Sequence, residues 1–160
     1  MNSVKSILFV CTGNSCRSVM AEGLMKKYLK SLGQNDITVR SAGVRALDGY
    51  SPTDETIEVM GEEGVDMSGF RSSAITEEAI KGADLILAMG TIHKNEVIRC
   101  VPEASAKTFL LKEYGRTDKG RVEETDVPDP IGQSLAEYKT CLETIKREIE
   151  RVAKMLSASL

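Results

Sequence analysis

The chain places a cysteine and an arginine within one short polar turn. Cys11 and Arg17 are separated by five residues, and Gly13 lies between them. A cysteine thiolate is a strong nucleophile, and the planar guanidinium of arginine suits phosphate oxygens. Glycine lets the backbone approach an oxyanion closely. The pattern therefore predicts a thiolate facing a bound phosphate. The alternative is that Cys11 and Cys16 are only small buried hydrophobic residues at a turn.

An apolar run precedes this turn, and a helical pattern follows it. Residues 6–10 have the composition of a buried parallel strand, and apolar residues then recur at helical spacing as far as Leu29. The turn should therefore lie at the amino end of a helix, where unpaired N–H groups and the helix dipole attract anions. The same positive potential favours the thiolate form of Cys11.

A phosphate ester also needs a proton for its leaving oxygen, and a carboxylic acid on a loop can supply it. Asp129 lies between Pro128 and Pro130, which restrict the backbone on both sides. Alone, this segment would indicate only an exposed acidic turn. In a chain that carries a thiolate site, we predict Asp129 as the general acid and Asp126 as a second choice.

Two polar side chains of the turn suit supporting roles. Asn14 tolerates left-handed backbone geometry, and its amide can tie the turn to neighbouring segments. The hydroxyl of Ser18 can donate a hydrogen bond to the thiolate. The only histidine, His93, is predicted to be a solvated helix residue rather than a metal ligand.

Strand-like segments alternate with helical patterns along the chain. The expected strands cover residues 6–10, 36–41, 83–89 and 107–111. Helices are expected up to about residue 32, from a Ser51 cap towards Gly64, from residue 75 to 80, from 91 to 101, and from 134 to 156. The polar stretch 113–129 is predicted to be a functional loop.

This order of elements predicts the α/β class, with residues 1–160 forming a single domain. We expect a four-stranded parallel sheet with helices on both faces. Ligands bind such sheets at the carboxyl ends of the strands, near the point where the strand order reverses. Cys11 stands at such a strand end.

Composition argues against several other functions. The net charge is −3, so no basic surface for nucleic acid or an anionic membrane is expected. No segment reaches the length of a membrane span, and residues 1–5 lead into the first strand without a signal-peptide pattern, which predicts a cytoplasmic protein. The four cysteines lack both a disulfide framework and zinc-ligand spacing, so no metal or cofactor is predicted.

The loop resembles the signature of the low molecular weight protein tyrosine phosphatases. It reads Val10-Cys11-Thr12-Gly13-Asn14-Ser15-Cys16-Arg17-Ser18, with Met20-Ala21-Glu22 after it. Further matches follow in family order: Arg40-Ser41-Ala42-Gly43, Leu87-Ala88-Met89, and Asp129-Pro130 followed by Tyr138. The resemblance covers nearly the whole chain. It is of the bacterial type, with features similar to the protein-arginine phosphatase branch.

The resemblance implies a role for each matched residue. Cys11, Arg17 and Asp129 would be catalytic, and phosphate would be bound by Thr12, Gly13, Asn14, Ser15, Cys16 and Ser18. Ser41 is similar to the family serine that braces the loop asparagine, and Tyr50 and Ile131 would form the substrate wall. Many relatives carry a histidine at the position of Phe70, so we expect the support of Asn14 to differ here.

The implied reaction dephosphorylates proteins through a phosphocysteine intermediate, without a metal. The thiolate of Cys11 attacks phosphorus while Asp129 protonates the leaving group, and water activated by Asp129 then hydrolyses the intermediate. Phosphotyrosine is the first substrate expected. Phosphoarginine is the alternative, because the arginine branch has a similar Cys-Thr-Gly-Asn-Thr-Cys-Arg loop. Relatives also pair the cysteines equivalent to Cys11 and Cys16 under peroxide, which predicts a reversible disulfide here.

Two other functions are less favoured, and the oligomeric state stays open. A thiol-coupled arsenate reductase shares this loop but needs two further cysteines close together, whereas Cys100 and Cys141 are 41 positions apart. A phosphate-binding or phospho-carrier module without enzymatic activity would need neither Arg17 nor a proline-flanked Asp129.

Overall fold

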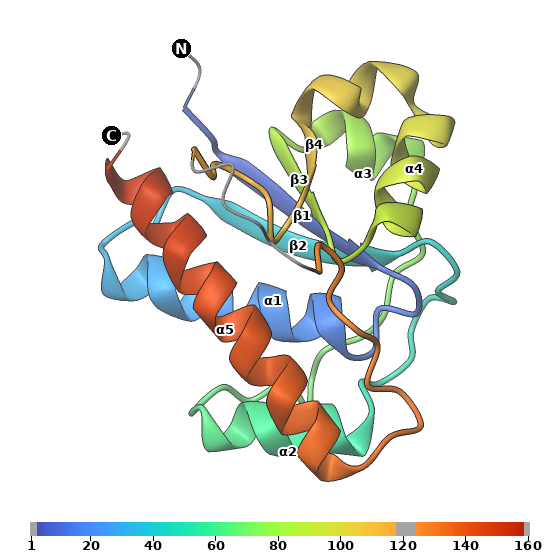
Figure 1. The fold of residues 1–160 in the computed structure, drawn as a ribbon, viewed down its shortest axis with the longest axis vertical. Coiled ribbons are helices and arrows are strands. Elements are labelled where there is room, and N and C mark those ends of the chain that lie inside the picture. The colour runs from blue at the N-terminus through green and yellow to red at the C-terminus, as the bar shows by residue number, and fades with distance from the viewer. Residues whose placement is uncertain (1–2, 118–123, 159–160) are drawn as a thin grey trace.

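The computed structural model describes residues 3–117 and 124–158. Its strands are β1 (Ser6–Cys11), β2 (Thr38–Gly43), β3 (Leu85–Ala88) and β4 (Thr108–Leu110). Its helices are α1 (Arg17–Ser31), α2 (Asp54–Glu62), α3 (Glu77–Gly82), α4 (Thr91–Cys100) and α5 (Leu135–Ala158), with a short 3-10 helix, η1 (Pro102–Lys107). Strands and helices alternate as the sequence predicted (Figure 1).

The four strands of the described chain form one parallel sheet in the order β2-β1-β3-β4. The chain runs from β1 outwards to β2 and then crosses to β3 on the other side of β1. The strand order therefore reverses at β1, and the carboxyl end of this strand is where a ligand is expected. Cys11 is the last residue of β1.

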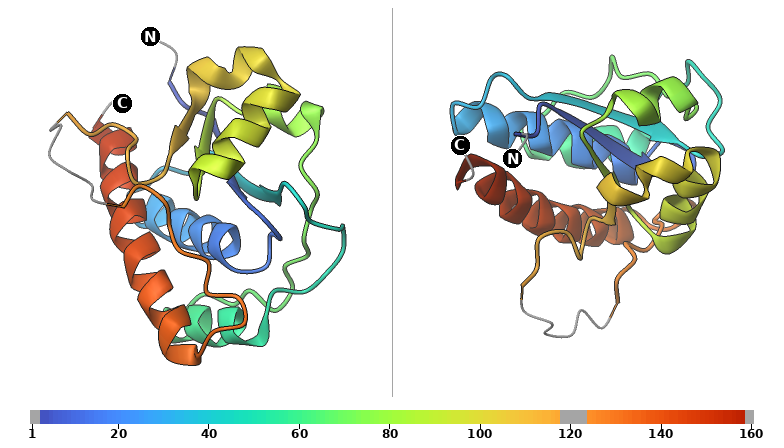
Figure 2. Two further views of the ribbon diagram at one scale, coloured as in Figure 1. Left: turned by 45° about the vertical axis from the view of Figure 1, so that its right-hand side comes forward. Right: turned by 90° about the horizontal axis from the view of Figure 1, so that it is seen from above.

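Alternate residues of β1 face opposite sides of the sheet. Ile7 and Phe9 are buried in one hydrophobic cluster with residues of α1, α2 and α5. Leu8 and Val10 are buried in a second cluster with residues of α3 and α4. Helices therefore cover both faces, as Figure 2 shows from two directions, and the predicted fold class is confirmed.

Several boundaries differ from the prediction for local reasons. β2 begins at Thr38 rather than residue 36, because Thr38 is the residue that pairs with the first residue of β1. α2 begins after Thr53 rather than Ser51, because the Thr53 hydroxyl accepts the hydrogen bond from the Thr56 amide at 3.3 Å. η1 was not predicted. Part of the predicted loop 113–129, residues 118–123, lies outside the described residues.

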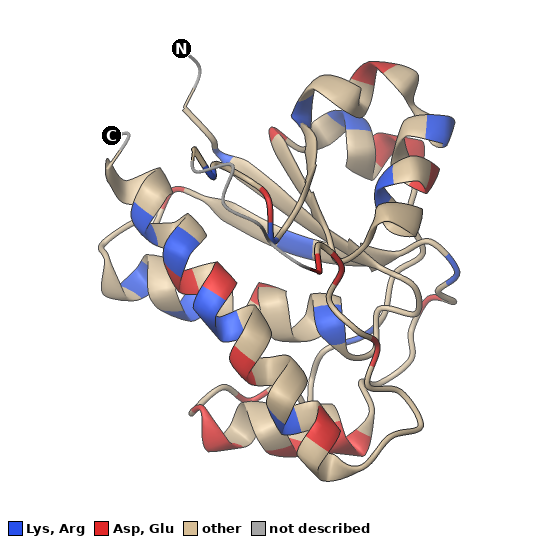
Figure 3. Cartoon of the chain, viewed as in Figure 1, with Lys and Arg blue, Asp and Glu red and all other residues tan. Residues whose placement is uncertain are grey.

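Charge is mixed along the long closing helix α5, where acidic and basic residues alternate (Figure 3). Within residues 3–117 and 124–158, no helix combines the length and the apolar character needed to cross a bilayer.

Candidate active site

The loop between β1 and α1 is held at both ends by regular structure. Cys11 ends the strand and Arg17 begins the helix. The carbonyl groups of Cys11 and Thr12 accept hydrogen bonds from the amides of Val44 and Arg45, each at 2.9 Å, so these oxygens are engaged by the segment after β2. The amides in the first turn of a helix have no partner within it. The loop is therefore suited to an anion.

The carboxyl end of β2 packs directly against this loop. A Cβ atom on Gly43 would lie 2.5 Å from the Thr12 oxygen and 2.9 Å from the Asn14 nitrogen. Any residue larger than glycine would push the loop out of place. Gly43 belongs to the matched segment Arg40-Ser41-Ala42-Gly43, but the sequence alone does not reveal this role.

Asn14 is the hub of a buried hydrogen-bond network. Its φ of 52° is the left-handed geometry that its residue type tolerates. Its Nδ2 donates to the hydroxyls of Ser18 at 2.8 Å and Ser41 at 2.9 Å. Its Oδ1 accepts from the Ser73 amide at 2.9 Å, which fixes the orientation of the side-chain amide. The structure thus brings Ser41 to Asn14, as the resemblance implied.

The donors and acceptors of this network leave the Ser18 hydroxyl free to donate a hydrogen bond to Cys11. Glu22 accepts from the Ser41 hydroxyl at 2.9 Å, so the oxygen of Ser41 is free to accept from Asn14. Ser18 also accepts from Asn14, and its own proton can then point to the Sγ of Cys11, 2.9 Å away. A hydroxyl donor at this distance stabilises a thiolate.

Glu22 supports Asn14 indirectly, through the hydroxyl of Ser41. It is only 8% exposed, and its second oxygen pairs with Lys26 at 2.9 Å. Phe70 instead packs, half-buried, against the hydrophobic cluster on the α1 side. That the support of Asn14 differs from that in other members of the family remains a prediction. The available signal was an acidic residue within the otherwise apolar stretch that begins α1.

Arg17 joins the phosphate loop to the segment before α5. Its guanidinium is buried, and its Nη1 donates to the Val127 carbonyl at 2.9 Å. Its Nη2 lies 3.4 Å from the Thr12 hydroxyl and 3.4 Å from the Oδ2 of Asp129. The guanidinium is therefore held at the loop, next to the acid predicted from the sequence.

The two candidate acids occupy different surroundings. The side chain of Asp129 is 40% exposed, and its Oδ1 accepts from the Ile131 amide at 3.1 Å. Asp126 instead caps α4, where its Oδ1 accepts from the amide and the hydroxyl of Thr91 at 2.9 and 3.1 Å. The structure brings Asp129 to Arg17 and gives Asp126 a separate task.

His93 is buried, so the prediction of a solvated histidine is wrong. It is 2% exposed, and its Nε2 lies 2.8 Å from the hydroxyl of Thr12. Burial and the nearby charge of Arg17 lower the pKa of His93 to about 4. The histidine belongs to the surroundings of the phosphate loop because α4 starts immediately after β3, beside the carboxyl end of β1.

Exposed apolar side chains lie beside both Gly13 of the loop and Asp129. Tyr50 is 63% exposed and Ile131 is 53% exposed. A hollow of about 230 Å³ lies against the loop at Gly13, and Tyr50 lines it together with Leu47, which the sequence analysis did not single out. The structure therefore places Tyr50 beside the loop and Ile131 beside Asp129.

The cysteines are all free thiols in the described structure. The Sγ of Cys16 lies 3.5 Å from the hydroxyl of Tyr138. Burial raises the pKa of the Cys141 thiol to about 12. Cys141 belongs to the cluster on the α1 side, and Cys100 packs against the cluster on the opposite face of the sheet. This arrangement does not suit the relay of neighbouring cysteines that an arsenate reductase needs.

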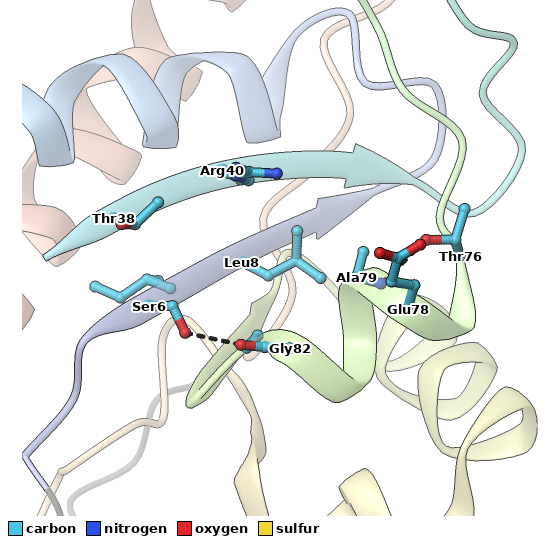
Figure 4. Close-up of a pocket in the computed structure, with 10 residues that line it drawn as sticks. Ser6, Leu8, Thr38, Arg40, Thr76, Glu78, Ala79 and Gly82 are labelled. Atoms are coloured by element: carbon cyan, nitrogen blue, oxygen red, sulfur yellow. Dashed lines mark hydrogen bonds between the residues drawn. The ribbon is translucent and has the colours of Figure 1, made fainter.

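A larger hollow, of about 490 Å³, lies between β1, β2 and α3, away from the phosphate loop (Figure 4). Its lining includes Ser6, Arg40 and Glu78 but no residue of the phosphate loop. Among the described residues, no group of three or more histidine, cysteine or acidic side chains is arranged to hold a metal ion.

The fold and the loop define a class of phosphatases. The sequence model described as "Low molecular weight phosphotyrosine protein phosphatase" matches residues 6–160. The chain therefore belongs to this family of hydrolases, and the resemblance found in the sequence is confirmed.

Particular relatives have two kinds of named activity. The chain is 34% identical over 147 residues to a "Probable low molecular weight protein-tyrosine-phosphatase EpsP" of Ralstonia solanacearum, covering 92% of each chain. It is 39% identical over 150 residues to a "Protein-arginine-phosphatase" of Bacillus subtilis (strain 168), covering 94% of this chain and 95% of that one. The structure superposes with a TM-score of 0.86 on a mutant YwlE arginine phosphatase with a phosphorylated active-site serine, at 38% identity over 94% of this chain and 95% of that one.

Proposed function

We propose that residues 1–160 form one phosphatase domain that hydrolyses phosphotyrosine in proteins through a phosphocysteine intermediate. The observation that carries the proposal is the buried sulfur of Cys11, 2.9 Å from the Ser18 hydroxyl, in a loop whose Arg17 contacts Asp129. The family match over residues 6–160 supports the extent of the domain.

In the first step the sulfur of Cys11 attacks phosphorus, and the bond from phosphorus to the leaving oxygen breaks. Arg17 and the loop amides stabilise the negative charge on the three remaining phosphoryl oxygens. A phosphoryl dianion can compete with Asp129 for the guanidinium of Arg17, because the Asp129 carboxylate lies 3.4 Å from that guanidinium and is only loosely paired with it. The Asp129 carboxyl, in its protonated form, then donates its proton to the leaving oxygen.

In the second step water hydrolyses the phosphocysteine. The Asp129 carboxylate takes a proton from the water molecule while the water oxygen bonds to phosphorus, and the S–P bond breaks. The Cys11 thiolate is regenerated beside Ser18, and inorganic phosphate leaves. The phosphorylated serine in the YwlE mutant supports a covalent phosphoenzyme in this family.

Phosphoarginine is the second candidate substrate. It is favoured by the small side chain of Ser15 in the loop and by the named activity of the Bacillus subtilis relative. Phosphotyrosine is favoured by the exposed ring of Tyr50, because stacking against a phenyl ring contributes ~1 kcal/mol. Turnover of matched phosphotyrosine and phosphoarginine peptides, measured side by side, decides between them.

Pre-steady-state kinetics test the proposed mechanism. With p-nitrophenyl phosphate, we expect a burst of p-nitrophenol equal to the enzyme concentration, followed by steady turnover, when hydrolysis of the intermediate limits the rate. Binding of the compound without release of p-nitrophenol would instead indicate a phosphate-binding module.

The proposal extends to location and redox control. We infer a cytoplasmic enzyme acting on phosphorylated proteins, in which mild peroxide joins Cys11 and Cys16 reversibly. Both thiols are free and stand in the same curled loop. Peptide mapping after peroxide should find the disulfide, whereas sulfinic or sulfonic acid on Cys11 alone would rule out this protection.

A further inference from the structure

The buried side of the phosphate loop holds a histidine with one unpaired nitrogen. The Nε2 of His93 lies 2.8 Å from the Oγ1 of Thr12. Its Nδ1 is buried and has no hydrogen-bond partner in the described structure. A buried polar atom without a partner costs free energy, so its presence next to a reactive loop calls for an explanation.

A carboxylate lies near this nitrogen, on the other side of Gly90. A Cβ atom on Gly90 would lie 3.0 Å from the Oδ2 of Asp126 and 3.4 Å from the Nδ1 of His93. Because Gly90 has no side chain, Asp126 Oδ2 and His93 Nδ1 can both lie close to its backbone. The Oδ1 of Asp126 is engaged by Thr91, which orients the carboxylate. No direct hydrogen bond joins Oδ2 to His93, so a link between them requires one bridging water.

This arrangement selects one tautomer of the imidazole. With the proton on Nδ1, the N–H can donate to a water bound by the Asp126 carboxylate, and Nε2 is left as an acceptor. The Thr12 hydroxyl then donates a hydrogen bond to Nε2. Its oxygen keeps its lone pairs for the Nη2 of Arg17, which is 3.4 Å away and can only donate.

The imidazole stays neutral in this position. The charged groups that act on it are Arg17 at the loop and two carboxylates, Asp126 and Asp129, on the segment before α5. Burial and Arg17 lower the pKa of His93 to about 4, and these effects outweigh the two carboxylates. A neutral ring can accept from Thr12, whereas a protonated ring could only donate.

We propose that His93 is a positioning residue for Arg17: it accepts a hydrogen bond from the Thr12 hydroxyl, is oriented by Asp126 through one water, and so aims the Thr12 oxygen at the guanidinium that binds phosphate. This inference deepens the proposed function and rests on it. Substrate phosphate bound by Arg17 meets a guanidinium whose direction is already set from the far side of the loop.

Binding of inorganic phosphate tests this role without requiring turnover. His93→Phe keeps a buried ring but removes both nitrogens, and we expect it to weaken phosphate binding, measured by calorimetry, about tenfold. His93→Gln can place an amide oxygen near the position of Nε2, so it should recover most of that loss. Equal weakening by Phe and Gln, or no weakening by Phe, would overturn the proposal.

A double-mutant cycle checks that the effect passes through Thr12. Thr12→Val removes the hydroxyl but keeps the branched shape. If His93 acts through this hydroxyl, the Thr12→Val/His93→Phe double variant should bind phosphate no more weakly than the weaker single variant. Independent, multiplicative losses would contradict the proposal. Absence of phosphocysteine in the wild type would instead contradict the proposed function and leave the binding results interpretable.

Discussion

The two halves of the candidate site are built differently. The half around Cys11 is buried, and Asn14, Ser18 and Ser41 are joined by hydrogen bonds of 2.8 to 2.9 Å. In the other half, the side chain of Asp129 is 40% exposed, and its Oδ2 lies 3.4 Å from the Nη2 of Arg17. The difference indicates that the nucleophile and anion site around Cys11 is formed before substrate arrives, and we call it the fixed half. The acid Asp129 adjusts to the substrate, and we call its surroundings the adjustable half.

Breaking the fixed half should have the largest effect. Cys11→Ser should lower kcat by about 10⁴-fold or more, because a hydroxyl is not ionised by this loop and sulfur is the activated nucleophile. Steady-state assays with p-nitrophenyl phosphate measure the loss. Phosphate binding should persist in this variant, since the loop amides and Arg17 remain. Activity close to that of the wild type would remove the mechanism.

Breaking the adjustable half should give a smaller and more selective loss. Asp129→Ala should lower kcat by ~10²–10⁴ on esters with poor leaving groups and less on p-nitrophenyl phosphate, which needs little help from an acid. The measurement is a series of aryl phosphates of rising leaving-group pKa.

Asp126→Ala is the matched control for that series. Because Asp126 caps α4 and faces His93, its loss should slow good and poor leaving groups by the same factor. If Asp126→Ala showed the dependence on leaving group instead, the general acid would be Asp126.

The sequence was enough to predict the fixed half but not all of its supports. Strand and helix periodicity located the turn, and residue chemistry identified Cys11, Arg17 and Asn14 within it. The supporting roles of Glu22 and His93 were not predicted because both residues lie on helices, where burial depends on what packs against them. Local sequence describes His93 as one polar residue of a polar helix. Only the position of α4 beside β1 brings it to Thr12.

The substrate wall was predicted only by resemblance. Tyr50 and Ile131 are exposed residues of irregular segments, so no periodic pattern sets their positions. Gly43 was missed for the opposite reason. Its role is to leave room for the loop, since a Cβ atom at this position would lie 2.5 Å from the Thr12 oxygen, and this close approach becomes visible only once β1 and β2 are paired.

Ser15, in the loop between β1 and α1, should control substrate choice. Ser15→Ile should shift kcat/KM towards phosphotyrosine and away from phosphoarginine by about 10- to 200-fold, since small pocket changes give ~1–3 kcal/mol of discrimination. Paired peptides that differ only in the phosphorylated residue measure the ratio. An unchanged ratio would show that position 15 does not set specificity.

The smallest expected effect comes from the pH dependence of stability. The pKa of His93 is about 4 when folded, against about 6.5 when unfolded, so only the unfolded state takes up this proton between those values. Stability should therefore fall as the pH is lowered, by about 1 kcal/mol between pH 7.5 and 6. Urea unfolding of His93→Phe should lack this component, because the chain has no other histidine. Identical pH dependence in the two proteins would mean that His93 titrates normally when folded.

Rapid acid quench followed by peptide mass spectrometry tests the central claim most directly. The wild-type protein is mixed with p-nitrophenyl phosphate, stopped during the first turnover and digested under conditions that preserve S–P bonds. We expect one phosphoryl group on the peptide that carries Cys11, and none on that peptide in Cys11→Ala. A chain that turns over this substrate while Cys11 stays unmodified at every time point, or that carries the group on another residue, would contradict the account.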